Sequence, residues 1–336
     1  MRQRHIEIFV SLAKHLESFG TTPHSREIIE QAVSENHWFT TEDIVRAVEA
    51  IRTEMLSRHK LEAWAERYIA AERAKRVAVI MAGNLPLVGF FDLLCILLAG
   101  HECHIKPSSK DSVLMRYITQ ELRSIDSTVA IYEFDPTAEY DMLIATGGDA
   151  AVHHFDTHYP TTRRLLRGSR HSVAILDGRE TEAELQALCD DITAYSGLGC
   201  RSVSLLLVPK GYIPELKCDA PRCKKLERNL RSERALRTMT AQTYADCGGF
   251  ILATGDDFPT SLAVVHTREY SSLDDVREWL KERGDHLQCV VSHIADLDDS
   301  LPFGRTIPFG RAQYPALTDY ADGIDTMAWL TTEKDS

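Results

Sequence analysis

The beginning of the chain has the periodicity of amphipathic helices. Apolar residues recur there every three or four positions, which places them on one face of a helix. A hydroxyl residue followed by acidic residues at Thr40-Thr-Glu-Asp43, just before Ile44, is typical of a capped helix start. We therefore expect residues up to about Arg76 to be helical; the first such face comprises Ile6, Phe9, Val10, Ala13 and Leu16.

From Val77 onwards, short apolar runs alternate with longer segments of helical pattern. The run Val77–Met81 predicts a buried strand, and the apolar segment after it predicts a helix that ends near Gly100. Such alternation indicates an α/β chain with a largely parallel sheet. The other expected strands are Cys103–Lys106, Val129–Phe134, Asp141–Ala145, Val173–Leu176, Val203–Val208, Leu262–Val265 and Gln288–Ser292, and the other expected helices are Ser109–Ser124, the segment after Thr181, Pro221–Tyr244 and Ser272–Glu282.

The pattern divides near Cys200 into two α/β cycles, which predicts two domains. We expect a first domain over residues 1–196, a second over 197–310 and a C-terminal tail over 311–336. The tail begins in a turn-rich segment, and Ile324–Leu330 then has the pattern of one last strand. Because such a strand often pairs with another subunit, we expect an oligomerisation tail and a homo-oligomer.

Composition narrows the class of protein. The 336 residues carry a formal net charge of -12, which argues against a general nucleic-acid binder. The longest apolar stretch, Leu85–Gly100, contains Asp92 and is too short to span a membrane, and the N-terminus has no signal-peptide core. The eight cysteines lack the spacing of a disulfide framework, so we expect reduced thiols in a cytoplasmic protein.

The segment Tyr195–Ser202 has the sequence of a presented nucleophile. It places Cys200 after Gly197 and Gly199 and before Arg201. Glycines allow a sharp turn, and an adjacent arginine favours the thiolate, which is the form of cysteine that attacks carbonyl carbon. The alternative is a buried cysteine in a tight turn.

Three further turns follow predicted strands, where α/β proteins bind their ligands. Asn84, in Gly83-Asn-Leu-Pro86, can donate to a carbonyl oxygen that becomes negative, or it can simply cap the helix. Lys106 and Ser108 end the next strand, and a lysine there can hold a ribose or phosphate or remain solvated. Thr146, Gly147 and Gly148 precede a possible helix, whose N-terminus could accept a phosphate.

Two groups of cysteine and histidine resemble metal sites but lack the required geometry. In His101-Glu-Cys103-His104 adjacent strand residues point to opposite faces, so packing explains them better. Cys218 and Cys223 have no second pair nearby, so we expect no metal. The basic run Lys217–Arg237 predicts a solvated helix face, and the alternative is a surface for coenzyme A phosphates or an acidic acyl carrier.

The order of these motifs resembles the aldehyde dehydrogenase superfamily. The matching patterns are G-N-x-P from Gly83, A-G-H-x-x-x-x-K-P-S up to Ser108, A-T-G-G up to Gly148 and G-L-G-C-R up to Arg201. Within that superfamily they are most similar to the LuxC-type acyl-CoA reductases, and the segment 308–326 resembles the C-terminal signature of this group. The resemblance implies an aldehyde-dehydrogenase-like fold with two α/β domains, the first carrying a Rossmann-like sheet for a nicotinamide dinucleotide and the second the catalytic cysteine.

The resemblance also assigns roles to individual residues. Cys200 would accept the acyl group from an acyl-CoA or acyl-carrier thioester, and Asn84 would donate to the oxyanion. The cofactor would be NADPH, with NADH possible, and reduction would release a fatty aldehyde, with a possible partner protein that transfers the acyl group. The residues implied at the cofactor are Lys106 and Ser108 for the adenosine ribose, Thr146, Gly147 and Gly148 for the pyrophosphate, and Asp256 for the nicotinamide ribose, although Asp256 could equally be a solvated loop carboxylate.

One departure from the superfamily pattern bears on the direction of the reaction. Aldehyde-oxidising relatives carry a glutamate that activates water, whereas the corresponding stretch here, residues 167–172, has no carboxylate. Without a general base the acyl-enzyme would resist water, which favours reduction. The same loss is expected in an inactive enzyme, so two alternatives remain: a cysteine acyltransferase or thioesterase without nicotinamide, and a non-catalytic scaffold subunit.

Overall fold

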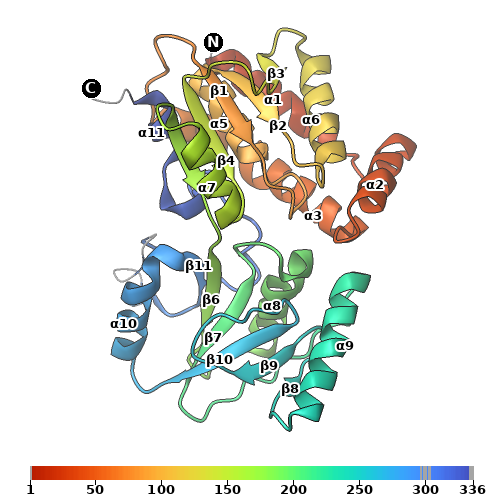
Figure 1. Cartoon of the computed structure of the whole chain (residues 1–336), viewed down its shortest axis with the longest axis vertical. Coiled ribbons are helices and arrows are strands. Elements are labelled where there is room, and N and C mark those ends of the chain that lie inside the picture. The colour runs from red at the N-terminus through yellow and green to blue at the C-terminus, as the bar shows by residue number, and fades with distance from the viewer. Residues whose placement is uncertain (1, 296, 298–300, 302–303, 333–336) are drawn as a thin grey trace. The chain divides into compact units, whose positions relative to one another are not determined.

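The structure is a computed structural model that describes residues 2–295, 297, 301 and 304–332, apart from the side chains of 149–151. The chain forms two compact units; in Figure 1 the first runs from red to green and includes the dark blue C-terminal segment, and the second runs from green to blue. The first comprises Met1–Ser169 and Pro315–Ser336, and the second comprises Arg170–Tyr314. The division falls after Ser169 instead of after residue 196, because the strand that begins at His171 pairs within the second unit.

The first unit contains a parallel five-stranded sheet in the order β3-β2-β1-β4-β5. This order is that of the Rossmann-type nucleotide-binding sheet, and its direction changes between the neighbours β1 and β4. The predicted strands are confirmed, whereas the basic strand β5 was not expected. The bounds are β1 Arg76–Ile80, β2 Glu102–Lys106, β3 Ile131–Glu133, β4 Met142–Thr146 and β5 Arg163–Arg167.

Helices cover both faces of this sheet. One face packs with the predicted N-terminal helices and their successors in a large apolar core, and α7 packs on the other face through Phe155. The apolar helix α5 ends where Gly100 adopts φ 91°, a left-handed conformation that glycine accepts without strain. The helices are α1 Arg2–Leu16, α2 Pro23–Glu35, α3 Thr41–Ala50 with a π-helical turn at Ile51–Met55, α4 Arg58–Ala65, α5 Phe90–Ala99, α6 Ser112–Ile125 and α7 Asp149–His158.

The C-terminal segment is part of the first unit, and the strand expected at Ile324–Leu330 is wrong. This segment instead forms the helix α11, Thr326–Thr331, after a short 3-10 turn at Ala321–Gly323. Met327 and Leu330, three positions apart, are buried in the core of the first unit, and that spacing suits a helix. Residues 333–336 of the predicted tail lie outside the described part of the chain.

The second unit contains a six-stranded sheet in the order β11-β6-β7-β10-β9-β8, parallel except for the short pair β8–β9. Alternate residues of its strands point to opposite faces, and α8 covers one face while α10 covers the other. The strands are β6 His171–Ile175, β7 Val203–Pro209, β8 Ala245–Asp246, β9 Ile251–Thr254, β10 Val264–Tyr270 and β11 Leu287–Val291. The helices are α8 Glu182–Thr193, α9 Lys224–Met239 and α10 Leu273–Arg283. A 3-10 turn follows α8 at Ala194–Gly197, and another follows α10 at Gly284–His286.

Local signals in the second unit formed as predicted, with one correction about cysteine. Thr181 and Glu184 make the expected capping box at the start of α8. Cys189 of α8, however, forms a disulfide with Cys218, so the prediction of eight reduced thiols is wrong for this pair. The sequence could not show it, because the two cysteines are 29 positions apart and belong to no framework of regular spacing.

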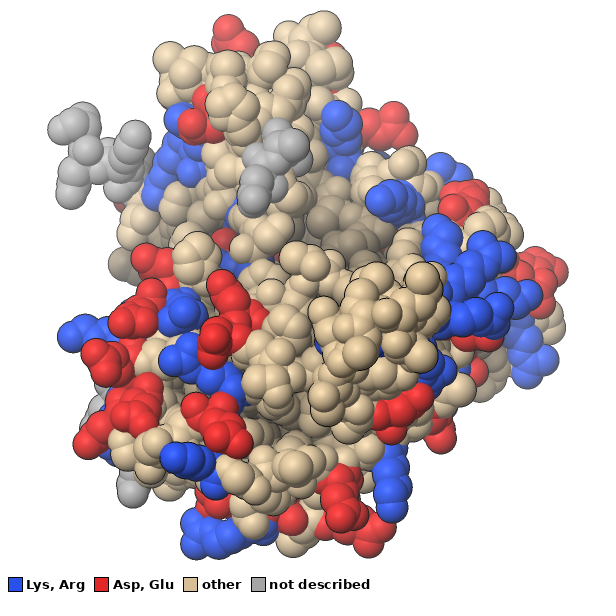
Figure 2. All heavy atoms as spheres, turned by 60° about the horizontal axis from the view of Figure 1, so that its bottom comes forward, with Lys and Arg blue, Asp and Glu red and all other residues tan. Residues whose placement is uncertain are grey.

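The surface carries charges of both signs. On the face drawn in Figure 2, acidic and basic side chains are mixed at the left, few charged side chains lie in the middle, and a group of Lys and Arg lies at the right. The arginines of α9 have acidic neighbours, as in the pairs Arg231–Glu227 and Arg234–Asp246. Within the described part of the chain, no helix is long and apolar enough to cross a membrane.

Candidate active site

Cys200 follows a turn with an unusual backbone. Tyr195 (φ 54°), Ser196 (φ 58°) and Gly197 (φ 73°) all lie in the left-handed region, immediately after α8. Only glycine adopts this region freely, so two successive non-glycine residues there carry backbone strain. The chain therefore reverses sharply between α8 and β7, and Cys200 lies at the amino end of β7.

The backbone of Cys200 is held by the neighbouring strand. The buried hydroxyl of Ser172, in β6, donates to the carbonyl oxygen of Cys200 at 2.8 Å. Ser172 Oγ also lies 3.0 Å from Sγ of Cys289, in β11. Ser172 thus ties the backbone at Cys200 to β6 and itself contacts the adjacent strand β11.

A segment from the end of the second unit supports the loop from another side. The buried carboxyl of Asp191, in α8, accepts hydrogen bonds from the backbone N–H groups of Gly310 at 2.6 Å and Ala312 at 3.0 Å. Arg201 Nε donates to the carbonyl oxygen of Ala312 at 2.5 Å, and Gln313 donates to the hydroxyl of Ser202 at 3.2 Å. Residues 310–313 therefore fix both the helix before Cys200 and the residues after it.

The environment of Asp191 is unusual for an aspartate. Burial raises its pKa to about 7, against the opposing effect of the two backbone hydrogen bonds and of the Arg201 charge. Arg201 is thus engaged with Asp191 and Ala312. Its contribution to a thiolate at Cys200 stays a prediction.

The exposure of the cysteines separates Cys200 from the others. All eight cysteines lie in the described part of the chain, and six are outside the disulfide. Of these six, Cys200 alone is partly exposed. The buried remainder comprises Cys95, Cys103, Cys223, Cys247 and Cys289. Cys200 is therefore the thiol best placed to meet a substrate.

In the first unit, the predicted ligand-binding turns lie along one edge of the sheet. Lys106 ends β2 and is paired with Ile80 of β1, whose neighbour on the other side is Ala145 of β4. The strands are parallel, so the turns after β1, β2 and β4 all leave the carboxyl edge. Asn84, Lys106, Ser108 and Thr146 are brought to this edge, where open α/β sheets bind ligands.

Close packing holds the turns after β1 and β2 together. A Cβ on Gly83 would come within 2.5 Å of Cβ and Oγ of Ser108, so only glycine fits there. The amide of Asn36 donates to the carbonyl oxygens of Gly83 at 3.4 Å and Lys110 at 3.2 Å, which links the two turns. Asn84 itself is exposed between these anchored neighbours.

The turn after β4 opens onto a helix, as expected. Gly147 donates to the carbonyl oxygen of Arg167, and Gly148 precedes α7 in an extended conformation. No described atom lies within 4 Å of the position that a Cβ on Gly148 would occupy. The space beside Gly148 is therefore open with respect to the described side chains.

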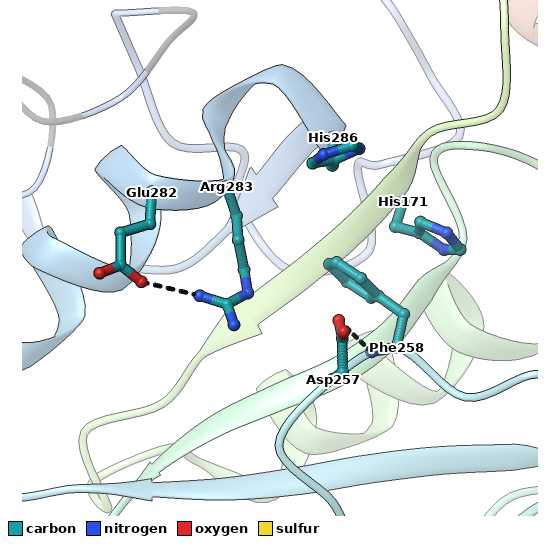
Figure 3. Close-up of a pocket in the computed structure, with 6 residues that line it drawn as sticks. All are labelled: His171, Asp257, Phe258, Glu282, Arg283 and His286. Carbon is teal, nitrogen blue, oxygen red and sulfur yellow. Dashed lines mark hydrogen bonds and ion pairs between the residues drawn. The ribbon is translucent and has the colours of Figure 1, made fainter.

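Asp256 is placed differently from the other predicted cofactor residues. It belongs to the second unit, in the loop between β9 and β10, where its side chain is 93% exposed and lies 3.7 Å from Arg268. Its neighbours Asp257 and Phe258 line a pocket of about 560 Å³, and the ring of Phe258 stacks on His171 at 4.3 Å (Figure 3). The remaining lining residues are Glu282, Arg283 and His286.

The stretch that lacks the superfamily glutamate is occupied by structural contacts. Arg167 turns into the first unit and forms an ion pair with Asp92, both side chains being less than 10% exposed. Arg170 donates to the carbonyl oxygen of Leu287, and His171 stacks on Phe258. No carboxylate therefore comes from residues 167–172.

The first group that resembled a metal site, His101-Glu-Cys103-His104, packs in the first unit as expected, whereas Cys218 of the second group forms the disulfide with Cys189. His101 is buried between the backbone N–H of Lys75 and the carbonyl oxygen of Leu330, and His104 stacks on Tyr132. The roles of Asp191, Ser172 and the segment 310–313 were not predicted from the sequence. Their polar side chains were visible, but their contacts join residues that are 28 to 121 positions apart.

Comparisons with known proteins agree on the family and the fold. The family model described as acyl-CoA reductase (LuxC) matches residues 14–217. Long-chain acyl-protein thioester reductase 2 from Photobacterium leiognathi is 25% identical, covering 45% of this chain and 36% of its own. The long-chain acyl-protein thioester reductase from Aliivibrio fischeri is 24% identical, covering 79% of this chain and 60% of its own. The chain thus spans about a third to three fifths of the length of these relatives.

Solved structures show the same fold at low identity. Lactaldehyde dehydrogenase from Escherichia coli is similar over 91% of this chain and 78% of its own, with a TM-score of 0.65 and 14% identity. A propionaldehyde dehydrogenase from Clostridium phytofermentans is similar over 93% of this chain and 83% of its own, with a TM-score of 0.61 and 13% identity. The predicted aldehyde-dehydrogenase-like fold is thereby confirmed, and the chain belongs to the LuxC acyl-CoA reductase family.

Proposed function

We propose that this protein reduces acyl thioesters to aldehydes through an acyl-enzyme on Cys200. One observation carries the proposal: among the described cysteines outside the disulfide, Cys200 alone is partly exposed, and it follows a strained turn anchored on several sides. Strain of this kind persists where the surrounding structure enforces it, and it is common at catalytic residues. A merely structural cysteine would need neither feature.

In the first step the Cys200 thiolate attacks the carbonyl carbon of the thioester. A new carbon–sulfur bond forms to Cys200, the bond to the donor sulfur breaks, and the donor leaves as a thiol after taking a proton. The backbone N–H of Cys200 and the side-chain amide of Asn84 are the proposed donors to the oxyanion. Loss of one such donor costs about 3 kcal/mol of barrier, so Asn84→Ala should slow acylation about a hundredfold.

The carboxyl edge of the first sheet has groups that fit a nucleotide. Lys106 is exposed there, and the space beside Gly148, which precedes the N-terminus of α7, is open with respect to the described side chains. We propose that Lys106 and Ser108 hold the adenosine ribose, that Thr146, Gly147 and Gly148 hold the pyrophosphate, and that Asp256 contacts the nicotinamide ribose. When bound, the reduced nicotinamide supplies the hydride that converts the acyl group to an aldehyde. NADPH is the proposed form and NADH the alternative; one of the structural neighbours was solved with NAD+.

Residues 167–172 favour reduction over hydrolysis. Arg167 is committed to Asp92, and the stretch contains no carboxylate that could take a proton from water. The acyl-enzyme then persists without hydrolysis until hydride is transferred to it. Its release as an aldehyde also regenerates the Cys200 thiolate.

The proposed substrates are acyl-CoA or acyl-carrier thioesters. Both curated relatives are named as reductases of long-chain acyl-protein thioesters, which favours an acyl group delivered by a partner protein. The N-terminal part of α9, with Lys224, Lys225 and Arg228, is the proposed basic surface for such a carrier or for coenzyme A phosphates. We further propose a cytoplasmic homo-oligomer.

The decisive experiment separates acylation from reduction. Incubation with a panel of acyl-CoAs without nucleotide should give an acyl adduct on Cys200, detected by peptide mass spectrometry. Cys200→Ala should give none, and Cys223→Ala, which removes a buried cysteine, should behave as the wild type. Addition of NADPH or NADH should then discharge the adduct and consume the nicotinamide absorbance.

Each alternative predicts a different outcome. An acyltransferase or thioesterase forms the adduct but neither binds nor oxidises NADPH or NADH. A scaffold subunit forms no adduct, and its Cys200 alkylates no faster than the buried thiols. Reduction of acyl-CoA by Cys200→Ala would refute the proposal outright.

A further inference from the structure

The loop that carries Asn84 is held at both ends by buried polar side chains from other segments. It joins β1 to α5. At its start, the side-chain amide of Asn36 donates to the carbonyl oxygen of Gly83 at 3.4 Å. At its end, Oδ2 of Asp111 accepts the backbone N–H of Leu87 at 2.9 Å, and both residues are buried. Asn84 is one of only three residues between the two anchored positions.

Asp111 does not have the usual role of an aspartate at its position. It is the N-cap residue of α6, where a carboxylate normally accepts an N–H group of the first helical turn. Its side chain makes no such hydrogen bond and instead accepts the N–H of Leu87, 24 positions away. The other oxygen, Oδ1, is buried and makes no hydrogen bond to any described residue. A buried polar atom without a partner costs stability, so helix capping does not explain an aspartate here.

Leu87 needs an anchor because its backbone lies in the left-handed region. Its φ is 58°, which is unfavourable for leucine and persists only where the surrounding structure enforces it. The N–H of Phe90 donates to the carbonyl oxygen of Leu87 at 3.0 Å, so the chain turns into α5 directly after this residue. Without Asp111 the N–H of Leu87 would be buried with no acceptor, and the turn would relax to satisfy it.

The short segment between the two anchors has little freedom of its own. Pro86 has a fixed φ, and the residue before a proline is restricted to extended conformations. Gly83, at the other end, packs so closely against Ser108 that only glycine fits. A shift at Leu87 is therefore taken up largely at Asn84, whose side-chain amide is the proposed donor to the oxyanion. Misplacement of a catalytic group by about 1 Å can slow a reaction about a hundredfold.

We propose that Asp111 is a positioning residue for Asn84 and acts through the backbone of Leu87. The inference rests on the proposed function, in which Asn84 donates to the oxyanion while Cys200 is acylated. The role needs a hydrogen-bond acceptor and not a charge. Burial raises the pKa of the Asp111 carboxyl well above its usual range, against the opposing effect of the Leu87 N–H. The side-chain oxygen of an asparagine can accept the same N–H.

Two substitutions at Asp111 separate positioning from stability. Asp111→Ser keeps a good N-cap side chain for α6 but is too short to reach Leu87, whereas Asp111→Asn keeps the acceptor. Acylation of Cys200 is measured in a single turnover with an acyl-CoA and no nucleotide. Asp111→Ser should lower the maximum rate about tenfold at an unchanged half-saturating concentration, because the oxyanion forms only during the reaction. Asp111→Asn should acylate within about twofold of the wild-type rate.

A double-mutant cycle shows whether the effect passes through Asn84. Asn84→Ala already lacks the donor, so adding Asp111→Ser to it should slow acylation further by less than about twofold. Independent effects, which together would slow acylation about a thousandfold, would overturn the proposal. A wild-type rate in Asp111→Ser would also overturn it and leave the proposed function intact. A wild-type rate in Asn84→Ala would instead refute the oxyanion role of Asn84, and this inference with it.

Thermal unfolding and amide exchange complete the test. Thr40→Ala removes the N-cap of α3 and is the matched control, which should lower the unfolding temperature and leave acylation unchanged. Hydrogen exchange of the peptide that contains Leu87 should be faster in Asp111→Ser than in the wild type, and unchanged in Asp111→Asn. Equal exchange in all three proteins would show that Asp111 does not hold the loop and would overturn the proposal. If Asp111→Ser does not fold, Asp111→Thr, an equally short N-cap residue, takes its place.

Discussion

Arg167 Nη1 donates to both carboxylate oxygens of Asp92, at 2.7 and 2.8 Å. The second guanidinium nitrogen donates to the hydroxyl of Thr326 at 2.7 Å, in the C-terminal segment. The three residues therefore join β5, α5 and α11 inside the first unit. Burying two charges is costly, so the energetics depend on both partners being present.

Removal of one partner of this pair should destabilise the protein strongly. Asp92→Asn leaves the Arg167 charge buried without its counterion, and we expect the free energy of unfolding to fall by about 3–5 kcal/mol in urea titrations. Glu7→Gln, which breaks the surface pair with Arg58, is the matched control and should change it little. Equal effects of the two substitutions would contradict the structural role assigned to Arg167.

The left-handed turn before Cys200 should resist a side chain at Gly197. Gly197→Ala should cost about 1–2 kcal/mol of unfolding free energy, because its φ of 73° is unfavourable for alanine. The new Cβ would meet the Leu262 carbonyl oxygen only at 3.6 Å, so the cost is conformational. Gly148→Ala, at φ -72° in open space, should change stability by less than about 0.5 kcal/mol. Circular dichroism in urea checks both.

Asp191 should make stability depend on pH. Its pKa is about 7 in the folded protein and ~3.9 in the unfolded chain. Between these two pH values the carboxyl is protonated in the folded protein and ionised in the unfolded chain. The contribution of this group to stability therefore falls as the pH rises from about 4 to about 7, by at most about 1.4 kcal/mol per unit, and is constant above that range. Urea unfolding of the wild type and Asp191→Asn at several pH values isolates it: parallel profiles would show that Asp191 is ionised in the folded protein.

The disulfide between Cys189 and Cys218 should contribute measurably to stability. It closes a loop with a sequence separation of 29, so its reduction should lower the free energy of unfolding by about 3–4 kcal/mol. In the Cys189→Ala, Cys218→Ala double variant, added reductant should have no further effect. Alkylation of the unfolded, non-reduced chain should label six cysteines, and labelling of all eight would show that the bond does not form.

The sequence predicted those parts of the fold that depend on local pattern. Short apolar runs such as Val77–Met81 predicted the strands. Thr181 and Glu184 predicted a helix start, because the two side chains of a capping box lie within one helical turn. The turns at Asn84, Lys106 and Thr146 were recognisable because strand ends in a parallel sheet share one edge. The roles of the candidate cofactor residues, by contrast, came from the resemblance of the motifs to the aldehyde dehydrogenase superfamily.

The misses share a different physical origin. Apolar and polar residues alternate in Ile324–Leu330 as they do in a strand. The segment nevertheless forms a helix, because Met327 and Leu330 are then both buried in the core of the first unit, which includes α5. The contacts of Asp191 with Gly310 and of Asp177 with His293 join residues more than 110 positions apart, and no local spacing encodes them. The two strand ends that carry Asp177 and His293 become neighbours only in the folded sheet.

The return of the C-terminal segment to the first unit has a consequence for biosynthesis. The second unit is inserted into the first, whose sequence lies partly before Arg170 and partly after Tyr314. The ribosome therefore completes the second unit before it adds Thr326, Met327 and Leu330, which pack in the first unit. Domains generally fold as units during synthesis. The first unit therefore completes its core only after the second unit has been synthesised, because residues that follow the second unit in the sequence are buried in that core.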